Sequence, residues 1–142
     1  MSRCDWQNFV YEFHEKYGHH IPNHAVTLPS SAIVELRMEL LREELKELFE
    51  AMEDQDLEKI ADNLADLIYV ALGTAVSYGV DLDPVFEEVH RSNMTKRAPA
   101  SPAKPGEKYP EGHDPKGPGY EPPEIARVLL RQVLLSRQRG GG

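Results

Sequence analysis

Two short stretches decide the fold: Leu-Arg-Glu-Glu-Leu-Lys-Glu-Leu at residues 41–48, and Ile-Ala-Asp-Asn-Leu-Ala-Asp-Leu-Ile-Tyr-Val at residues 60–70. Both place acidic side chains inside otherwise apolar sequence with helical spacing. In the first stretch, Glu44 and Glu47 interrupt the apolar stripe that would face a core. A charge is costly to bury unless it is paired, neutralised or bound to a metal, so these carboxylates need a cation.

The second stretch predicts a helix that is apolar almost all round and therefore buried on most sides. Asp62, Asn63 and Asp66 are three and four positions apart, so their oxygens share one narrow face of that helix. A short turn at 53–56 would make the two helices antiparallel and bring the two acidic faces together. The sequence therefore predicts a pocket of four carboxylates.

An all-oxygen pocket without cysteine or histidine is typical of a hard cation, and we expect Mg²⁺, with Mn²⁺ as a possible substitute. The alternative is that the acids face solvent or pair with Arg37, Arg42 and Lys46. Three histidines in the loop at 19–24 can be attributed to loop polarity, with a transition-metal site as the alternative.

Composition excludes several classes of protein. The chain has 142 residues, a net charge of −8 and a pI of about 5.2, which argues against binding to nucleic acid. No apolar run reaches the roughly 18–20 residues of a membrane span, and no signal peptide is recognisable. The single cysteine, Cys4, excludes an internal disulfide framework. We expect a cytoplasmic protein that does not bind membranes.

Periodicity and capping residues predict helices throughout, interrupted by one long irregular segment. The first two expected helices cover residues 6–17 and 32–52, and the third is capped by Asp54 or Asp56 and continues to Tyr78. A fourth helix is expected to begin with Asp83 as cap and Pro84 in its first turn, with Val85, Phe86, Val89 and Met94 on its buried side. A short basic helix is expected to begin near Ile125. Between Arg97 and Pro123 prolines and glycines are concentrated, and no regular element is expected. The domain boundaries are thus 1–97 for a helical catalytic domain and 98–142 for a Pro/Gly-rich arm with a C-terminal helix.

The expected helix at 54–78 is too apolar for a four-helix monomer to cover. Small residues at Ala65, Ala71, Gly73 and Ala75 allow close approach of a second copy. The predicted fold is therefore an all-α four-helix bundle completed by assembly into a homodimer or homotetramer.

These residues resemble a known family, the all-α nucleotide pyrophosphohydrolases of the MazG-like group, which includes phosphoribosyl-ATP pyrophosphohydrolase and the dimeric dUTPases. The resemblance spans roughly residues 36–97 and rests on the two quoted blocks. It implies that Glu44, Glu47 and Asp66 bind magnesium. Asn63 stands where many members have glutamate, and Asp62 supplies an acid one residue earlier, as in the branch that resembles phosphoribosyl-ATP pyrophosphohydrolase.

The resemblance also extends to Val-His-Arg-Ser-Asn-Met-Thr-Lys at residues 89–96, where the family carries asparagine and lysine in its substrate cleft. It implies that Lys96 holds phosphate and that Asn93 holds a base, sugar or phosphate oxygen. Taken alone, such a pair is typical of a helix C-cap. Phe13-His14 and residues 116–120 are further candidates for closing over substrate.

The function implied is hydrolysis of a nucleoside triphosphate between its α- and β-phosphates. Glu43 would orient or deprotonate the attacking water, or is a solvated helix charge. Lys96 and Arg97 would offset charge on the leaving pyrophosphate. Alternatives are phosphoribosyl-ATP pyrophosphohydrolase of histidine biosynthesis and a non-catalytic helical interaction module.

Overall fold

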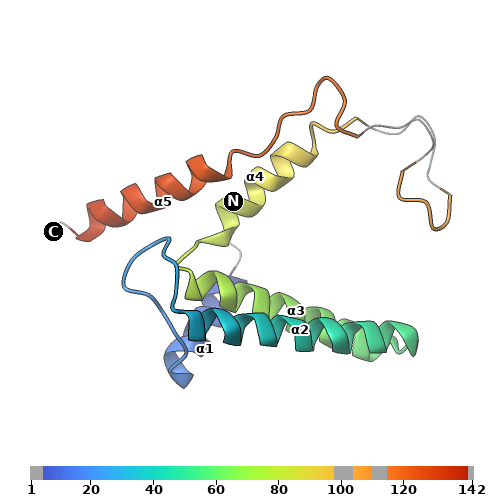
Figure 1. The fold of residues 1–142 in the computed structure, drawn as a ribbon, viewed down its shortest axis with the longest axis horizontal. Coiled ribbons are helices and arrows are strands. Elements are labelled where there is room, and N and C mark those ends of the chain that lie inside the picture. The colour runs from blue at the N-terminus through green and yellow to red at the C-terminus, as the bar shows by residue number, and fades with distance from the viewer. Residues whose placement is uncertain (1–4, 98–103, 110–114, 141–142) are drawn as a thin grey trace.

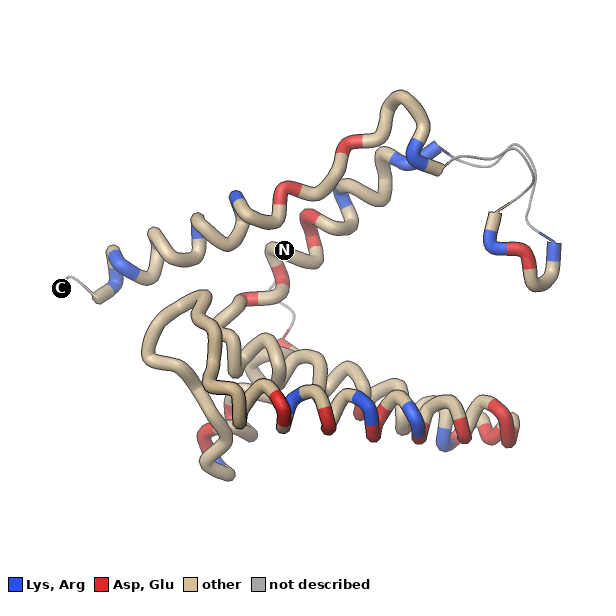
Figure 2. Tube along the Cα trace, viewed as in Figure 1, with Lys and Arg blue, Asp and Glu red and all other residues tan. Residues whose placement is uncertain are grey.

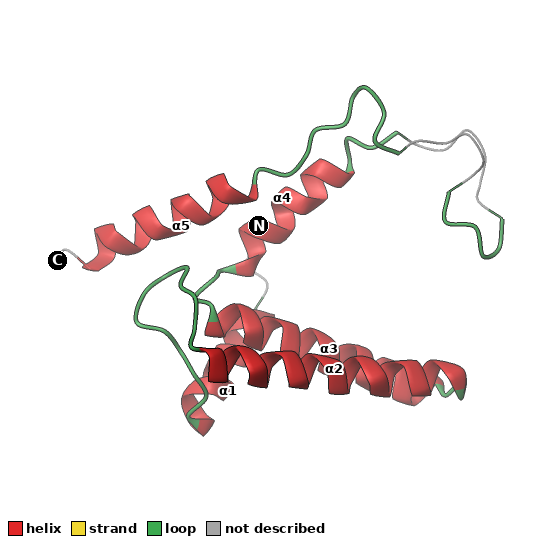
Figure 3. Cartoon of the chain, viewed as in Figure 1, coloured by secondary structure: helices red, strands yellow, loops and turns green. Residues whose placement is uncertain are grey.

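The computed structural model describes residues 5–97, 104–109 and 115–140, and all regular structure in these residues is helical (Figure 3). The prediction of an all-α protein is confirmed. The five helices are α1 (Trp6–Tyr17), α2 (Ser31–Glu53), α3 (Leu57–Ser77), α4 (Leu82–Asn93) and α5 (Ile125–Gly140). Cys4 and parts of the Pro/Gly-rich arm, 98–103 and 110–114, lie outside the described residues.

Helices α2 and α3 form a long antiparallel hairpin, the most extensive helix pairing in the chain (Figure 1). Ser30 caps α2 by accepting a hydrogen bond from the Ile33 N–H, and Asp56 caps α3 by accepting one from the Lys59 N–H at 3.1 Å. Each cap satisfies one of the backbone donors that a helix start leaves unpaired. The turn that joins the two helices is therefore fixed by its own sequence.

Helix α1 packs against α3 and ends where predicted, at Gly18, whose φ of 69° is in the left-handed region. The loop that follows α1 crosses the C-terminal end of α3, where the Val26 N–H donates to the Gly79 carbonyl at 2.9 Å. Gly79 also has a positive φ, and a Cβ there would lie 2.7 Å from the His24 carbonyl oxygen. This close approach requires glycine. The three helices α1, α2 and α3 thus form one packed unit.

Helix α4 leaves this unit and lies beside α5, with little contact to α1–α3 (Figure 1). Two predictions about α4 are wrong. Its N-cap is Asp81 rather than Asp83, so Pro84 is the third helical residue, where a missing N–H is still tolerated. Its predicted buried side is largely open, because Phe86 and Met94 are each 71% exposed in the single chain.

Helix α3 is partly uncovered in the single chain, as expected of a helix too apolar for one chain to cover. Its buried residues are confined to its C-terminal end (Gly73, Ala75, Val76 and Ser77), whereas Leu64 and Ile68 are 45% and 42% exposed. An apolar groove of about 340 Å³ runs between α1 and α3, lined by Trp6, Phe9, Val10, Ala65, Ile68, Tyr69 and Leu72. Coverage of this surface by a second copy stays a prediction.

By length and composition alone, α3 is also apolar enough to cross a membrane, which corrects the expectation that no segment of the chain is. A core helix of a soluble protein passes the same test. Asp62 and Asp66 on this helix would be costly in lipid. Charged residues of both signs follow the outer side of α2 in Figure 2.

Candidate active site between α1, α2 and α3

Glu44 on α2 is the most buried acidic residue of the two stretches at 41–48 and 60–70. The side chain as a whole is half-buried, but its Oε2 atom is sealed from solvent and has no hydrogen-bond partner. Burial raises the pKa of Glu44 above its usual range, and the neighbouring charges of Asp66, Glu47, Glu43 and Asp62 raise it further, in that order. Helices α2 and α3 therefore bring the carboxylates of the two quoted stretches within electrostatic reach of one another.

The other acidic candidates are more open. Glu43, Glu47, Asp62 and Asp66 are exposed, although Asp66 lines the same cavity as Glu44. As the side chains lie, no three His, Cys, Asp or Glu groups of the described ranges 5–97, 104–109 and 115–140 converge closely enough to hold a metal ion. The chemistry of this donor set fits a hard divalent cation, and the orphaned Glu44 oxygen is the observation that supports the fit.

Asn63 bridges the two helices. Its Nδ2 donates to the backbone carbonyl of Glu47 at 3.0 Å. This hydrogen bond holds α3 against α2. Its Oδ1 makes no hydrogen bond among the described residues. The structure thus gives Asn63 a packing role that its sequence position did not indicate.

A cavity of about 260 Å³ opens beside Glu44, between α1, α2 and α3. Acidic, basic, aromatic and aliphatic side chains all contribute to its lining. It is lined by Val10, Phe13, His14, His19, Arg37, Leu40, Glu44, Asp66, Tyr69, Val70 and Gly73. Of the substrate-contacting candidates from the sequence, His14 is therefore in this cavity.

Arg37 and His14 are both buried in this cavity, with exposed fractions of 6% and 2%. The Arg37 Nε donates to Thr74 Oγ1 at 3.2 Å and its Nη2 donates to the Val70 carbonyl at 2.8 Å. His14 Nδ1 lies 3.1 Å from the His20 carbonyl. Burial lowers the pKa of His14, and the nearby charge of Arg37 lowers it further, so the imidazole is neutral at physiological pH.

Gly73 makes this arrangement possible. A Cβ on that residue would lie 2.5 Å from Arg37 Nη2 and 3.0 Å from His14 Nε2, so any side chain there would displace both groups. The absence of a side chain lets the guanidinium and the imidazole lie against the α3 backbone. The glycine thus shapes the basic end of the cavity.

Asn93, Lys96 and Arg97 do not line the cavity in a single chain. Asn93 ends α4, and its carbonyl accepts a hydrogen bond from the Lys96 N–H at 3.1 Å. This arrangement is the helix C-cap that the sequence offers as the alternative to substrate binding. The Arg97 N–H donates to the Pro115 carbonyl at 2.9 Å, and the Arg97 side chain packs near Gly117. These residues therefore lie where α4 meets the returning arm.

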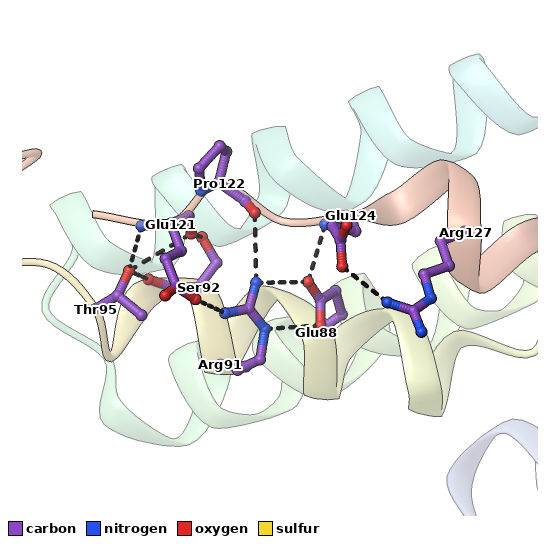
Figure 4. A network of polar contacts seen from close by, with 8 residues as sticks. All are labelled: Glu88, Arg91, Ser92, Thr95, Glu121, Pro122, Glu124 and Arg127. Carbon is purple, nitrogen blue, oxygen red and sulfur yellow. Dashed lines mark hydrogen bonds and ion pairs between the residues drawn. The ribbon is translucent and has the colours of Figure 1, made fainter. Parts of the chain in front are cut away.

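A polar network fastens that arm to α4 (Figure 4). Arg91 pairs with Glu88 and with Glu121, both at 2.8 Å, while the Glu124 N–H donates to Glu88 Oε1 at 2.9 Å. The hydrogen bond from Arg91 lowers the pKa of Glu88 to about 2, and the bond from the Glu124 N–H acts in the same direction. Ser92 is buried at 2% exposure and donates to the Glu121 carbonyl at 2.8 Å.

Arg37 is the main cavity residue that the sequence analysis did not propose for function. A signal was present, because Arg37 is seven positions before Glu44 and lies on the same stripe of α2. An arginine on a core-facing stripe needs an explanation just as a glutamate does. The sequence predicts Arg37 only as a possible counter-ion of the acids, yet none of the described carboxylates forms an ion pair with it.

The match of a family model identifies the class of protein, the MazG-like nucleoside triphosphate pyrophosphohydrolases, and the all-helical fold agrees with it. The family model for phosphoribosyl-ATP pyrophosphohydrolase matches residues 10–93, more than half of the chain, and the chain belongs to that family. The chain is also 32% identical over 77 residues to the uncharacterized protein L479 of Acanthamoeba polyphaga mimivirus. The aligned part is 52% of this chain and 31% of the viral protein. Family membership implies a pyrophosphohydrolase.

Proposed function

We propose that the protein is a Mg²⁺-dependent hydrolase that cleaves a nucleoside triphosphate between its α- and β-phosphates, giving a monophosphate and pyrophosphate. The observation that carries the proposal is the buried, unpartnered oxygen of Glu44 among four other carboxylates at the edge of a cavity. Membership of a pyrophosphohydrolase family supports the same chemistry.

Glu44, Glu47 and Asp66 would hold the magnesium, with Asp62 or Asn63 as a further ligand and Mn²⁺ as a possible substitute. When bound, the ion would offset the charge of the phosphate oxygens and make water more acidic. The residues of the chain would then position the substrate and the attacking water. Glu43, exposed one position before Glu44, is free to orient the attacking water or to accept its proton.

Lys96 and Arg97 would offset the charge of the departing pyrophosphate, and Asn93 would bind the nucleotide. These residues lie at the end of α4, away from the cavity of their own chain, so the proposal includes assembly into a homodimer or homotetramer. The open apolar groove between α1 and α3 and the exposed Phe86 and Met94 support such an assembly. The partners proposed are a small nucleotide and further copies of the chain, with neither nucleic acid nor membrane, in the cytoplasm.

A second candidate is phosphoribosyl-ATP pyrophosphohydrolase activity in histidine biosynthesis, which the family match supports equally well. It uses the same bond cleavage on a larger nucleotide. Turnover of phosphoribosyl-ATP, compared with turnover of ordinary nucleoside triphosphates, distinguishes the two. A non-catalytic helical module remains the alternative from another class, and it predicts no thermal shift with magnesium.

The test is a panel of nucleoside triphosphates incubated with magnesium, with separate detection of pyrophosphate and orthophosphate. Wild type should release pyrophosphate, and Glu47→Ala should release little. Glu50→Ala is the matched control, because Glu50 is an exposed residue of the same helix that pairs only with Lys46 at 3.8 Å. Equal pyrophosphate release by wild type and Glu47→Ala would contradict the proposal.

A further inference from the structure

Arg37 is a buried cation with unused hydrogen-bonding capacity. Two of the five guanidinium N–H donors are occupied, by Thr74 Oγ1 and the Val70 carbonyl, which leaves three. Arg37 is 6% exposed and lines the cavity, and it has no carboxylate partner among the residues that the structure describes. No Arg37 nitrogen is both sealed from solvent and without a partner, so the unpartnered Nη1 can be reached by an acceptor that enters the cavity.

The two ends of the cavity differ in charge along α2. Glu44 and Asp66 lie at its acidic end, and Arg37 lies seven residues before Glu44 on α2. Seven residues rise roughly 10 Å along a helix, close to two full turns, so both side chains face the same side. That span is sufficient for a nucleoside whose phosphates are at the acidic end and whose base extends toward Arg37.

Aromatic rings form part of the walls of the cavity, beside the aliphatic Val10, Leu40 and Val70. The Phe13 ring meets the Tyr69 ring edge-on with centroids 5.6 Å apart, and it stacks with the His19 ring at 5.4 Å. Phe13 and Tyr69 remain 37% and 39% exposed, so part of each ring is available to a ligand. Flat aromatic surfaces of this kind bind the faces of nucleobases.

The group that Arg37 contacts is better explained as a neutral acceptor than as a phosphate. Arg37 is the only permanently charged cation among the cavity residues, and His14 beside it has a lowered pKa and is neutral. A carbonyl oxygen of a base carries no net charge and needs only the donors that one guanidinium offers.

We propose that Arg37 is a specificity-determining residue that donates hydrogen bonds to a carbonyl oxygen on the edge of the substrate's base, so that keto bases are selected over amino bases. The inference rests on the proposed function, because it assigns the base end of the same site. A base that presents an amino group in place of the carbonyl would put N–H donors against N–H donors. Good arginine contacts to a base edge discriminate by on the order of ten- to a hundredfold.

The test uses two pairs of nucleotides, IMP with AMP and UMP with CMP, in which a carbonyl with an adjacent ring N–H is exchanged for an amino group with an adjacent ring nitrogen that accepts. Calorimetric titration of wild type should give tighter binding of the keto member of at least one pair, by about tenfold or more. Arg37→Lys keeps the charge but loses the fork of donors, so the preference should fall to about two- to threefold or less. Thr74→Val removes the Nε partner and the bond from Thr74 Oγ1 to the Val70 carbonyl, keeps the bond from Arg37 Nη2 to that carbonyl, and should retain the preference.

The binding measurement does not depend on turnover, so its failure is distinct from failure of the proposed hydrolysis. Equal binding of keto and amino members by wild type overturns the assignment without any variant, and so does a preference that Arg37→Lys retains. The kcat/KM ratios of ITP to ATP should change in parallel with binding. Exclusive binding of phosphoribosyl-ATP, lost in Arg37→Lys, would instead identify the acceptor as its second phosphate and overturn the proposal.

Discussion

Replacing Glu44 by glutamine should stabilise the protein in the absence of divalent metal while it abolishes metal-dependent activity. An unsatisfied buried polar group costs about 1–3 kcal/mol. In the wild type that group is the Glu44 Oε2, and the charges of Asp66 and Glu47 act on it unfavourably. Glutamine has the same shape, carries no charge and can donate to a neighbouring carboxylate. We therefore expect a gain of about 1 kcal/mol in the free energy of unfolding.

The gain should depend on pH in a defined direction. The pKa of Glu44 is raised in the folded state, so the folded protein holds this proton more tightly than the unfolded chain does. The contribution of Glu44 to stability is then fully present below its unfolded pKa and is lost as pH rises through the folded value. Glu44→Gln should match wild type in acid and become the more stable protein toward neutral pH.

The assay is urea unfolding with a metal chelator at several pH values, repeated with magnesium. Glu35→Gln is the control, because Glu35 is an exposed residue of the same helix and its change should stay within about 0.5 kcal/mol. With magnesium the order should reverse, since the ion stabilises only the protein that binds it. A Glu44→Gln variant less stable than wild type in chelator at neutral pH would refute the reasoning.

Three further predictions test the surrounding structure. Gly73→Ala should lower the free energy of unfolding by about 2 kcal/mol or more in urea unfolding, because its Cβ would lie 2.5 Å from Arg37 Nη2. Gly140→Ala is the control and should leave the free energy of unfolding nearly unchanged, because nothing lies within 4 Å of its Cβ. Arg91→Ala should speed amide hydrogen exchange at Glu121 and Glu124. In wild type, the protection of these amides from exchange should be lost as pH falls from 4.5, the usual pKa of Glu88, toward the pKa of about 2 that Glu88 has in the folded protein. Asp56→Ala should cost about 1 kcal/mol by thermal unfolding, through loss of the cap of α3.

The α2–α3 hairpin could be predicted closely from the sequence because its determinants are local. Helical spacing, a serine cap before α2 and an aspartate cap before α3 are properties of a few neighbouring residues. The placement of α4 depends on distant partners, and an apolar stripe at Phe86 and Val89 shows that a surface should be covered without showing by what. The hydrogen bonds from Arg91 to Glu121 span thirty residues of irregular chain, which no periodicity reports.

The acidic residues of the candidate site and the Phe13-His14 pair could be proposed from the sequence, whereas the place of Arg37 in it could not. An acid inside an apolar stripe, such as Glu44, departs from the helical pattern and can therefore be predicted as a site residue. Arg37 departs from the same pattern, but the sequence contains many acidic residues with which it could form an ion pair. Only the structure shows that its partners are a hydroxyl and a carbonyl. Asn63 is similar, since the bond from its amide to the Glu47 carbonyl depends on how the two helices meet.

The rigid spacing of α2 links the two halves of the proposed site. Arg37 and Glu44 belong to one helix that is braced against α3 at both levels, by the bonds of Arg37 to Val70 and Thr74 and by the bond of Asn63 to Glu47. The distance between base recognition and phosphate chemistry is then set by the rise of a helix rather than by the conformation of a loop. A site built this way accepts or rejects a base by its edge while the reacting phosphates stay at one place. Discrimination at Arg37 should therefore be expressed in productive positioning at Glu44 as well as in affinity.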